Sequence, residues 1–146
     1  MNFINTTLNY EECRYLLKSL DLVFYNALSS YIDIDNYIYK LSTHACFFLL
    51  SVNKDTVGGI AYYLNKDNME IYISYLCVSK GCRKNGYGDT LLSAFCEYAD
   101  NLKMAVRLEV RKNNVPAIHL YEKHGFIAFS QTENKQYMCR HYEYKK

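Results

Sequence analysis

Residues 75–92 read YLCVSKGCRKNGYGDTLL, where an apolar run precedes two basic residues and two glycines that stand one residue apart. Glycines this close together let the backbone approach another group, because they carry no side chain. They separate a predicted strand over 69–78 from a predicted helix over 86–102. The first turn of a helix has free N–H groups and the positive end of the helix dipole, so this loop is typical of a phosphate site. Arg83 and Lys84 would add positive charge beside it.

Two common phosphate motifs do not fit this loop. Gly81 and Gly86 have the separation of a Walker A loop, but Tyr87 and Gly88 stand where a lysine and a hydroxyl residue are required. Gly86 and Gly88 also begin a dinucleotide fingerprint, but Leu91 occupies the third glycine position. A bulky side chain there would push the helix away from the strand. The loop therefore requires another explanation.

The residues before the loop predict helices first and strands second. Apolar residues at helical spacing predict a helix over 10–20 and a weaker helical segment over 22–41 that is broken near 31–35. Apolar runs bounded by the turn sequences NKDT and NKDN then predict three antiparallel strands, at residues 44–52, 57–64 and 69–78.

The residues after the loop alternate between helices and strands. The stretch MAVRLEVR over 104–111 alternates strictly between apolar and polar residues, as a strand with one buried face does. Asn114 and Gly125 are suited to begin and end a short helix. The predicted elements are a helix over 86–102, a strand over 104–111, a helix over 114–124 and two strands over 126–131 and 136–144. This order predicts one domain, residues 1–146, of the α/β (α+β) class, with a mixed central sheet flanked by helices.

The composition narrows the function classes. A chain of 146 residues, half of them hydrophobic, has the size and the apolar content of one folded domain. A net charge of +2 is too small to favour a nucleic-acid partner. No apolar run reaches the length of about 18 residues that a membrane span needs, and the first residues lack the pattern of a signal peptide. The six cysteines form no metal-binding pattern, so we expect reduced thiols, no metal and a cytoplasmic protein.

Two motifs together resemble the GNAT (GCN5-related N-acetyltransferase) family. In residues 75–92 an apolar strand that ends in valine precedes Arg-x-x-Gly-x-Gly at the start of a helix, which is similar to the pyrophosphate loop of this family. In NNVPAIHLYEKHGF at 113–126, the residues at the positions of the second family signature are Asn114, Ala117, Tyr121, Gly125 and Phe126. The two motifs have the expected order and separation, and the resemblance covers roughly residues 44 to 131.

The resemblance implies acetyl-CoA as the acyl donor, bound where two parallel central strands part, here 69–78 and 104–111. Parted strands leave backbone N–H and C=O groups without partners, and the amides of a pantetheine arm can pair with them. The strand residues expected to do so are Leu76, Cys77 and Val78. The loop residues whose backbone would bind the pyrophosphate are Arg83, Lys84, Asn85, Gly86, Tyr87, Gly88 and Asp89. The second motif would complete the cofactor site through Asn114, Ala117 and Tyr121.

The reaction that the resemblance implies is direct attack of a neutral amine on the thioester. A backbone N–H near Val78 would stabilise the oxyanion. Tyr121 matches the family tyrosine near the sulfur and is the expected general acid, because its ordinary pKa keeps it protonated at neutral pH. Glu109, in RLEVRKNN, matches a base of the ribosomal-protein N-terminal acetylases, and burial in a partly dry gap would raise its pKa. Glu70 is the rival base, and pairing with Arg107 or Arg111 is the structural alternative for Glu109.

The acceptor is the least determined part of the reaction. The hairpin and central strand are similar to those of family members that act on small molecules or amino sugars, so a small-molecule primary amine is the expected acceptor. The LEVRKNN stretch leaves a peptide N-terminus open. A non-catalytic acyl-CoA sensor is the rival from another class. Family members often form homodimers through their late strands, which makes a homodimer an open expectation.

Overall fold

The computed structural model of the chain describes residues 1–142. These residues form two compact units, each described by itself. Unit 1 holds residues 1–62 and 75–88, and unit 2 holds residues 63–74 and 89–142. No helix within residues 1–142 is long and apolar enough to span a membrane.

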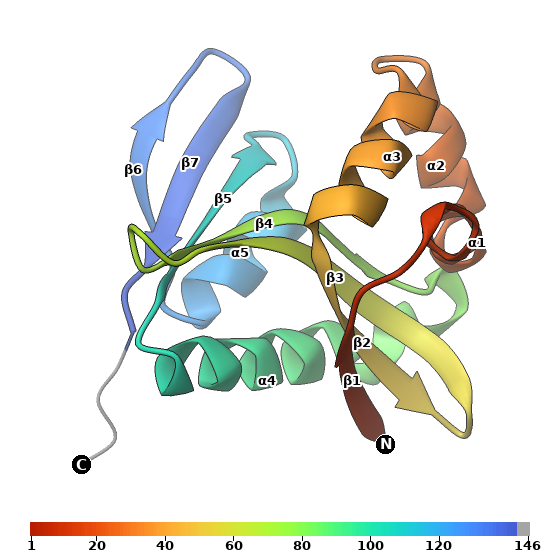
Figure 1. The fold of residues 1–146 in the computed structure, drawn as a ribbon. Helices are drawn as coiled ribbons and strands as arrows, with labels where there is room; N and C mark the ends of the chain where they lie inside the picture. The colour runs from red at the N-terminus through yellow and green to blue at the C-terminus, as the bar shows by residue number, and fades with distance from the viewer. Residues whose placement is uncertain (143–146) are drawn as a thin grey trace. The chain divides into compact units, whose positions relative to one another are not determined.

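Seven strands pair into one sheet in the order β1-β2-β3-β4-β5-β7-β6 (Figure 1). The strands β1 to β7 are Asn2–Thr6, Cys46–Val52, Asp55–Asn65, Glu70–Val78, Ala105–Arg111, Ile127–Gln131 and Lys135–Arg140. β4 and β5 are parallel, whereas β1 with β2, β2 with β3, β5 with β7 and β6 with β7 are antiparallel. The mixed sheet and its helices confirm the predicted α/β class. The part of the last predicted strand beyond residue 142 lies outside the described residues.

Three short helices of unit 1 each begin at a capping side chain. They are α1 (Tyr10–Leu20), α2 (Leu22–Ser29) and α3 (Ile34–His44). Asn9 begins α1 with a capping box, because its side chain accepts from the Glu12 N–H at 2.9 Å while the Glu12 carboxylate accepts from the Asn9 N–H at 3.0 Å. Asp21 and Asp33 cap α2 and α3. The predicted break near 31–35 is confirmed.

The chain starts with a strand, so the prediction that helices come first was wrong. β1 pairs with β2 from Asn2↔Ser51 to Thr6↔Phe47, and the Tyr62 hydroxyl donates to Asn5 Oδ1 at 2.6 Å. Four of the five β1 residues are exposed and the fifth is half-buried. A strand at the edge of a sheet that buries neither face shows no alternation of apolar and polar residues, so the sequence carried no signal for it.

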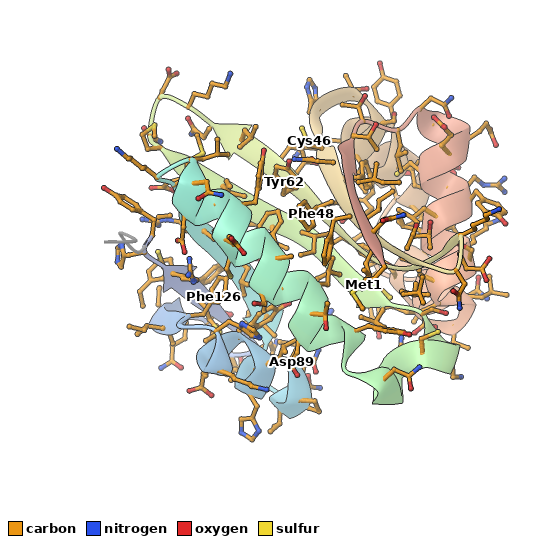
Figure 2. All side chains as sticks on the ribbon, turned by 90° about the horizontal axis from the view of Figure 1, so that it is seen from below. Met1, Cys46, Phe48, Tyr62, Asp89 and Phe126 are labelled. Carbon is orange, nitrogen blue, oxygen red and sulfur yellow. The ribbon has the colours of Figure 1, made fainter. Side chains whose placement is uncertain are left out.

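The core of unit 1 lies between its strands and helices. Figure 2 labels Cys46 and Tyr62, which are cross-strand partners of β2 and β3, and Tyr62 is fully buried. The helices contribute the buried residues Cys13, Leu16, Leu17, Leu20, Ile38 and Leu41. Gly59 of β3 is closely covered, because a Cβ atom there would lie 2.9 Å from Leu49 Cδ2. Any larger residue at this position would therefore require the Leu49 side chain to shift within a closely packed core.

Unit 2 contains β5, β7, β6, α5 (Val115–Lys123) and α4 (Tyr87–Asn101) from residue 89 onward, together with the end of β3 and the first residues of β4. The alternation predicted for β5 is confirmed, since Val106, Leu108 and Val110 are buried and the residues between them are exposed. α4 buries the stripe Leu91, Leu92, Phe95, Cys96 and Ala99. The sequence therefore identified two of the buried faces of unit 2, on β5 and α4, whereas buried Tyr121, Phe126 and Met138 come from other segments.

An ion pair that the sequence did not predict ties the end of α4 to β7. Arg140 donates to both carboxylate oxygens of Asp100, at 2.8 and 3.0 Å, and its Nε donates to the His124 carbonyl at 2.9 Å. Both side chains of the ion pair are 9% exposed. A buried charge pair with this many hydrogen bonds fixes the geometry of the elements that carry it.

The parallel contact between β4 and β5 is short. Its register covers three pairs, Glu70↔Ala105 to Tyr72↔Arg107. β5 goes on pairing with β7 as far as Arg111↔Lys135. Within unit 2, β5 therefore has four residues beyond Arg107, its last partner in this register.

Candidate active site

The glycine loop folds into a short 3₁₀ helix rather than an irregular turn. β4 ends at Val78, the 3₁₀ helix spans Lys80–Asn85, and α4 begins at Tyr87. The Ser79 N–H donates to the Val57 carbonyl at 2.7 Å and the Cys82 N–H donates to the Ser79 carbonyl at 2.8 Å. The loop therefore leaves β4 along a defined backbone path and ends at the first N–H groups of a 15-residue helix.

Gly86 is required for its backbone conformation. Its φ is +74° and its ψ is 15°, in the left-handed region, where it ends the 3₁₀ helix and precedes α4. A Cβ atom at Gly86 would meet no atom within 4 Å, and the same is true at Gly81, which has no positive φ. The sequence suggested that Gly86 and Gly88 let the backbone approach another group, and at Gly86 the structure adds a second reason, because a left-handed φ favours glycine.

The Arg83 guanidinium donates hydrogen bonds to two groups of the protein. Its Nη2 donates to Asp21 Oδ2 in an ion pair, and its Nε donates to the Val78 carbonyl at 3.2 Å. The Arg83 side chain is still 47% exposed. The charge expected at a phosphate is therefore partly neutralised by a carboxylate. The side chain of Lys84 lies outside the described part, whereas Asn85 and Gly86 are exposed and Tyr87 and Gly88 are half-buried.

The end of β4 carries Leu76, Cys77 and Val78. Cys77 and Val78 are buried and Leu76 is half-buried. Burial raises the pKa of the Cys77 thiol, although contacts with Tyr75 and Arg83 lower it in part. A raised pKa keeps the thiol protonated and opposes its use as a nucleophile.

Tyr121 is a buried tyrosine of α5 in unit 2. It is 8% exposed, and its ring packs against Phe126 with 5.5 Å between ring centroids. Burial raises its pKa to about 12. Within residues 1–142 the structure records no hydrogen bond of its hydroxyl. The side chain thus presents one protonated hydroxyl at the end of a buried ring.

Asn114 caps the helix that carries Tyr121. Its Oδ1 accepts from the Ala117 N–H at 3.3 Å, which confirms the predicted N-cap. Its side-chain NH₂ group has two donors in addition, which is what an acceptor group on a ligand needs. Gly125 ends this segment with a φ of +90°, as the sequence predicted.

Both candidate bases form ion pairs in unit 2. Glu109 Oε1 accepts from Lys135 Nζ at 3.2 Å, and Glu70 Oε2 accepts from Arg107 Nε at 2.9 Å. The Glu109 side chain is 38% exposed and that of Glu70 is 31% exposed. The dry surroundings expected for Glu109 are therefore not observed. The ion-pair partner of Glu109 is Lys135 on the neighbouring strand β7, rather than Arg107 or Arg111 on its own strand.

Asp89 lies in the first turn of α4 and is labelled in Figure 2. Its Oδ1 is 3.0 Å from both Lys123 Nζ and His124 Nε2 at the end of α5. Hydrogen bonds from Lys123 and then from His124 hold the pKa of Asp89 below its ordinary value. The negative charge of the Asp89 carboxylate would oppose binding of an anion at the start of α4. The positively charged Lys123, and His124 in its charged form, offset that negative charge.

Sequence reasoning missed Asp21, Lys135 and the His124–Asp89 pair. Asp21 directly precedes the apolar stretch LVFY, so a helix-capping signal for it was available. Its pairing with Arg83 joins residues 62 positions apart, and no local pattern reports that. The same holds for His124 and Asp89, which are 35 positions apart.

The acetyltransferase (GNAT) family matches residues 10–126. The chain belongs to the GNAT acetyltransferase family. A curated relative, the probable N-acetyltransferase camello of Xenopus laevis, is 31% identical to this GNAT protein over 97 residues, which are 65% of this chain and 44% of the relative. The chain therefore spans less than half the length of that relative.

Solved structures share the fold of this GNAT protein at low sequence identity. The ribosomal-protein-S18-alanine N-acetyltransferase of Escherichia coli gives a TM-score of 0.76 at 15% identity, with 99% of this chain and 97% of that chain covered. The PaiA N-acetyltransferase of Thermoplasma acidophilum, solved in complex with coenzyme A, gives 0.72 at 15% identity, with 97% and 100% covered. At these identities the likeness shows the fold alone.

Proposed function

We propose that this chain is an acetyl-CoA-dependent N-acetyltransferase that acts on a primary amine, with a small-molecule amine or amino sugar as the favoured acceptor. Family membership supports the reaction class. The observation that carries the catalytic proposal is Tyr121, a buried phenol whose pKa is raised to about 12. A phenol with this pKa is protonated throughout the neutral range, as a proton donor to a leaving thiolate must be.

The loop supplies the expected contacts for the anionic part of acetyl-CoA. The first turn of a helix directs backbone N–H groups along the helix axis, and Gly86 places no side chain before the first turn of α4. The donor supplies an activated acyl group on sulfur. Backbone groups at Leu76, Cys77 and Val78 are proposed to hold its pantetheine arm, together with Asn114 and Ala117, and a backbone N–H near Val78 is proposed to stabilise the oxyanion. Asp89 is proposed to contribute its backbone N–H, because its carboxylate is bound by α5.

The reaction requires one bond to form, one bond to break and two protons to be transferred. The neutral amine forms a bond to the acyl carbon, the carbon–sulfur bond breaks, and Tyr121 gives its proton to the leaving sulfur. The nitrogen then loses a proton, and an equivalent proton from the solvent converts the Tyr121 phenolate back to the phenol. Glu109 is the proposed acceptor of that proton through water, and Glu70 is the alternative. Either carboxylate must release its cationic partner, Lys135 or Arg107, or act while paired.

The test is release of free thiol from acetyl-CoA with a panel of acceptors that contains alkylamines, amino sugars and peptides with free N-termini. Tyr121→Phe should lower kcat by about 10²–10⁴-fold, the range for loss of a general acid, while coenzyme A affinity is retained. Tyr25→Phe is the matched control, because Tyr25 has the same exposed fraction of 8% but lies on α2. Tight coenzyme A binding without turnover on any acceptor would instead identify a sensor.

The two carboxylates can be separated by a second pair of variants. Glu109→Gln and Glu70→Gln each remove one charge from one ion pair, so they perturb unit 2 to a similar extent. The variant that lacks the base should lose the acidic limb of the kcat/KM profile against pH, and the other variant should keep it. If both variants keep wild-type profiles, the amine enters already neutral and no carboxylate acts as base.

A further inference from the structure

Asp21 is a buried carboxylate outside both family motifs. It is 7% exposed, its Oδ1 accepts from the Phe24 N–H at 3.0 Å as the cap of α2, and its Oδ2 accepts from Arg83. Burial raises the pKa of Asp21, but the Phe24 N–H and the Arg83 guanidinium outweigh it and leave the pKa below its ordinary value. The residue is therefore held as a charged group in unit 1.

Arg83 is fixed at two points by this contact. Its Nη2 is bound to Asp21, and its Nε is bound to the carbonyl of Val78, the last residue of β4. A guanidinium is planar and rigid, so two partners on different nitrogens set the orientation of the whole group. Arg83 lies within the 3₁₀ helix, three residues before Gly86, so this orientation also constrains the backbone of the loop.

We propose that Asp21 and Arg83 act as positioning residues, which hold the glycine loop in the conformation that presents its N–H groups to the diphosphate of coenzyme A. This inference rests on the proposed function of the loop as the acetyl-CoA site. It differs from the reading in which Arg83 contacts the phosphates directly. In that reading Asp21 opposes binding, because it neutralises the cation and adds a negative charge near an anion.

The direction in which one substitution changes the affinity for coenzyme A distinguishes the two hypotheses. Asp21→Asn keeps a good helix cap, because asparagine caps helices as well as aspartate does, but it removes the charge that holds Arg83. Direct phosphate contact predicts tighter coenzyme A binding in this variant. Positioning predicts binding that is weaker by about tenfold, the scale of one lost charge-assisted hydrogen bond. KM for acetyl-CoA should rise by the same factor, while kcat at saturation stays within about twofold.

Arg83→Gln and the double variant complete the measurement. Arg83→Gln should weaken binding as much as Asp21→Asn, and the double variant should be no weaker than either single variant, because both changes remove the same contact. The affinity of Arg83→Lys for coenzyme A should lie between those of Arg83→Gln and the wild type, since lysine keeps the charge but cannot bind two partners through a planar guanidinium. Asp33→Asn is the matched control, because Asp33 caps α3 through the Asn36 N–H and its carboxylate is exposed.

Binding of coenzyme A is measured by titration calorimetry, after urea unfolding has shown that each variant is folded. If the wild type does not bind coenzyme A, the proposed function fails. If the wild type binds and Asp21→Asn binds equally or more tightly, the positioning role alone is overturned. If Asp21→Asn does not fold, Arg83→Gln decides, because that side chain is 47% exposed, and wild-type affinity in this variant overturns the inference.

Discussion

Gly86 allows the sharpest test of the loop geometry. Gly86→Ala introduces a Cβ atom that meets nothing within 4 Å, so steric overlap contributes nothing to its effect. The whole cost comes from a φ of +74°, which for a residue with a side chain is about 1–2 kcal/mol. For a chain of this length about 2–4 °C in Tm corresponds to 1 kcal/mol, so Tm should fall by about 2–8 °C. Gly86→Asn should lie between alanine and wild type, because asparagine enters this region more readily.

Gly81→Ala is the control, because Gly81 has equally open surroundings and no positive φ. Its Tm should stay unchanged or rise slightly, since alanine reduces the freedom of the unfolded chain. The assay is thermal and urea unfolding of the variants, followed by coenzyme A titration. Equal Tm values for Gly86→Ala and wild type, or equal losses at Gly81 and Gly86, would refute the argument from backbone conformation.

Three further substitutions test the packing and the charge pairs. Gly59→Val should lower the free energy of unfolding in urea by about 1–3 kcal/mol, because its Cβ would overlap Leu49; an unchanged midpoint would show that β3 shifts freely. Arg140→Met should cost about 3–5 kcal/mol in the same assay, because it leaves the Asp100 carboxylate buried without its cation, and a loss under about 1 kcal/mol would contradict that. Asp89→Asn should lower Tm near neutral pH, and the difference from wild type should shrink as the pH falls below 3.8 through the lowered pKa of Asp89; a difference independent of pH would rule out its ion pairs as the cause.

The elements that the sequence predicted best are those that bury one face. The alternation of residues 104–111 reports the buried residues of β5, and the helical stripe of residues 86–102 reports α4, because burial imposes a period on the sequence. β1 and the 3₁₀ helix were missed because neither buries a stripe of side chains. β1 is formed by backbone pairing at an edge, and six residues of 3₁₀ helix are too few to show a period.

In the candidate site, too, the sequence predicted the local features but not the contacts between distant residues. Asn114 as a cap and Gly125 as a helix end follow from local backbone demands, and the structure confirms both. The partners of Arg83, Glu109 and Asp89 are set by residues 62, 26 and 35 positions away, so no local pattern reports them. The catalytic assignments of Tyr121, Glu109 and Glu70 stay predictions until turnover is measured.

The raised pKa of Tyr121 has a practical consequence for finding the acceptor. With a pKa of about 12, only about one Tyr121 phenol in a thousand is ionised at pH 9. An alkylamine with the basicity of lysine gains roughly a hundredfold in its reactive neutral fraction between pH 7 and pH 9. Screening in mildly alkaline buffer would therefore amplify the signal of weak acceptors without ionising Tyr121, the proposed proton donor.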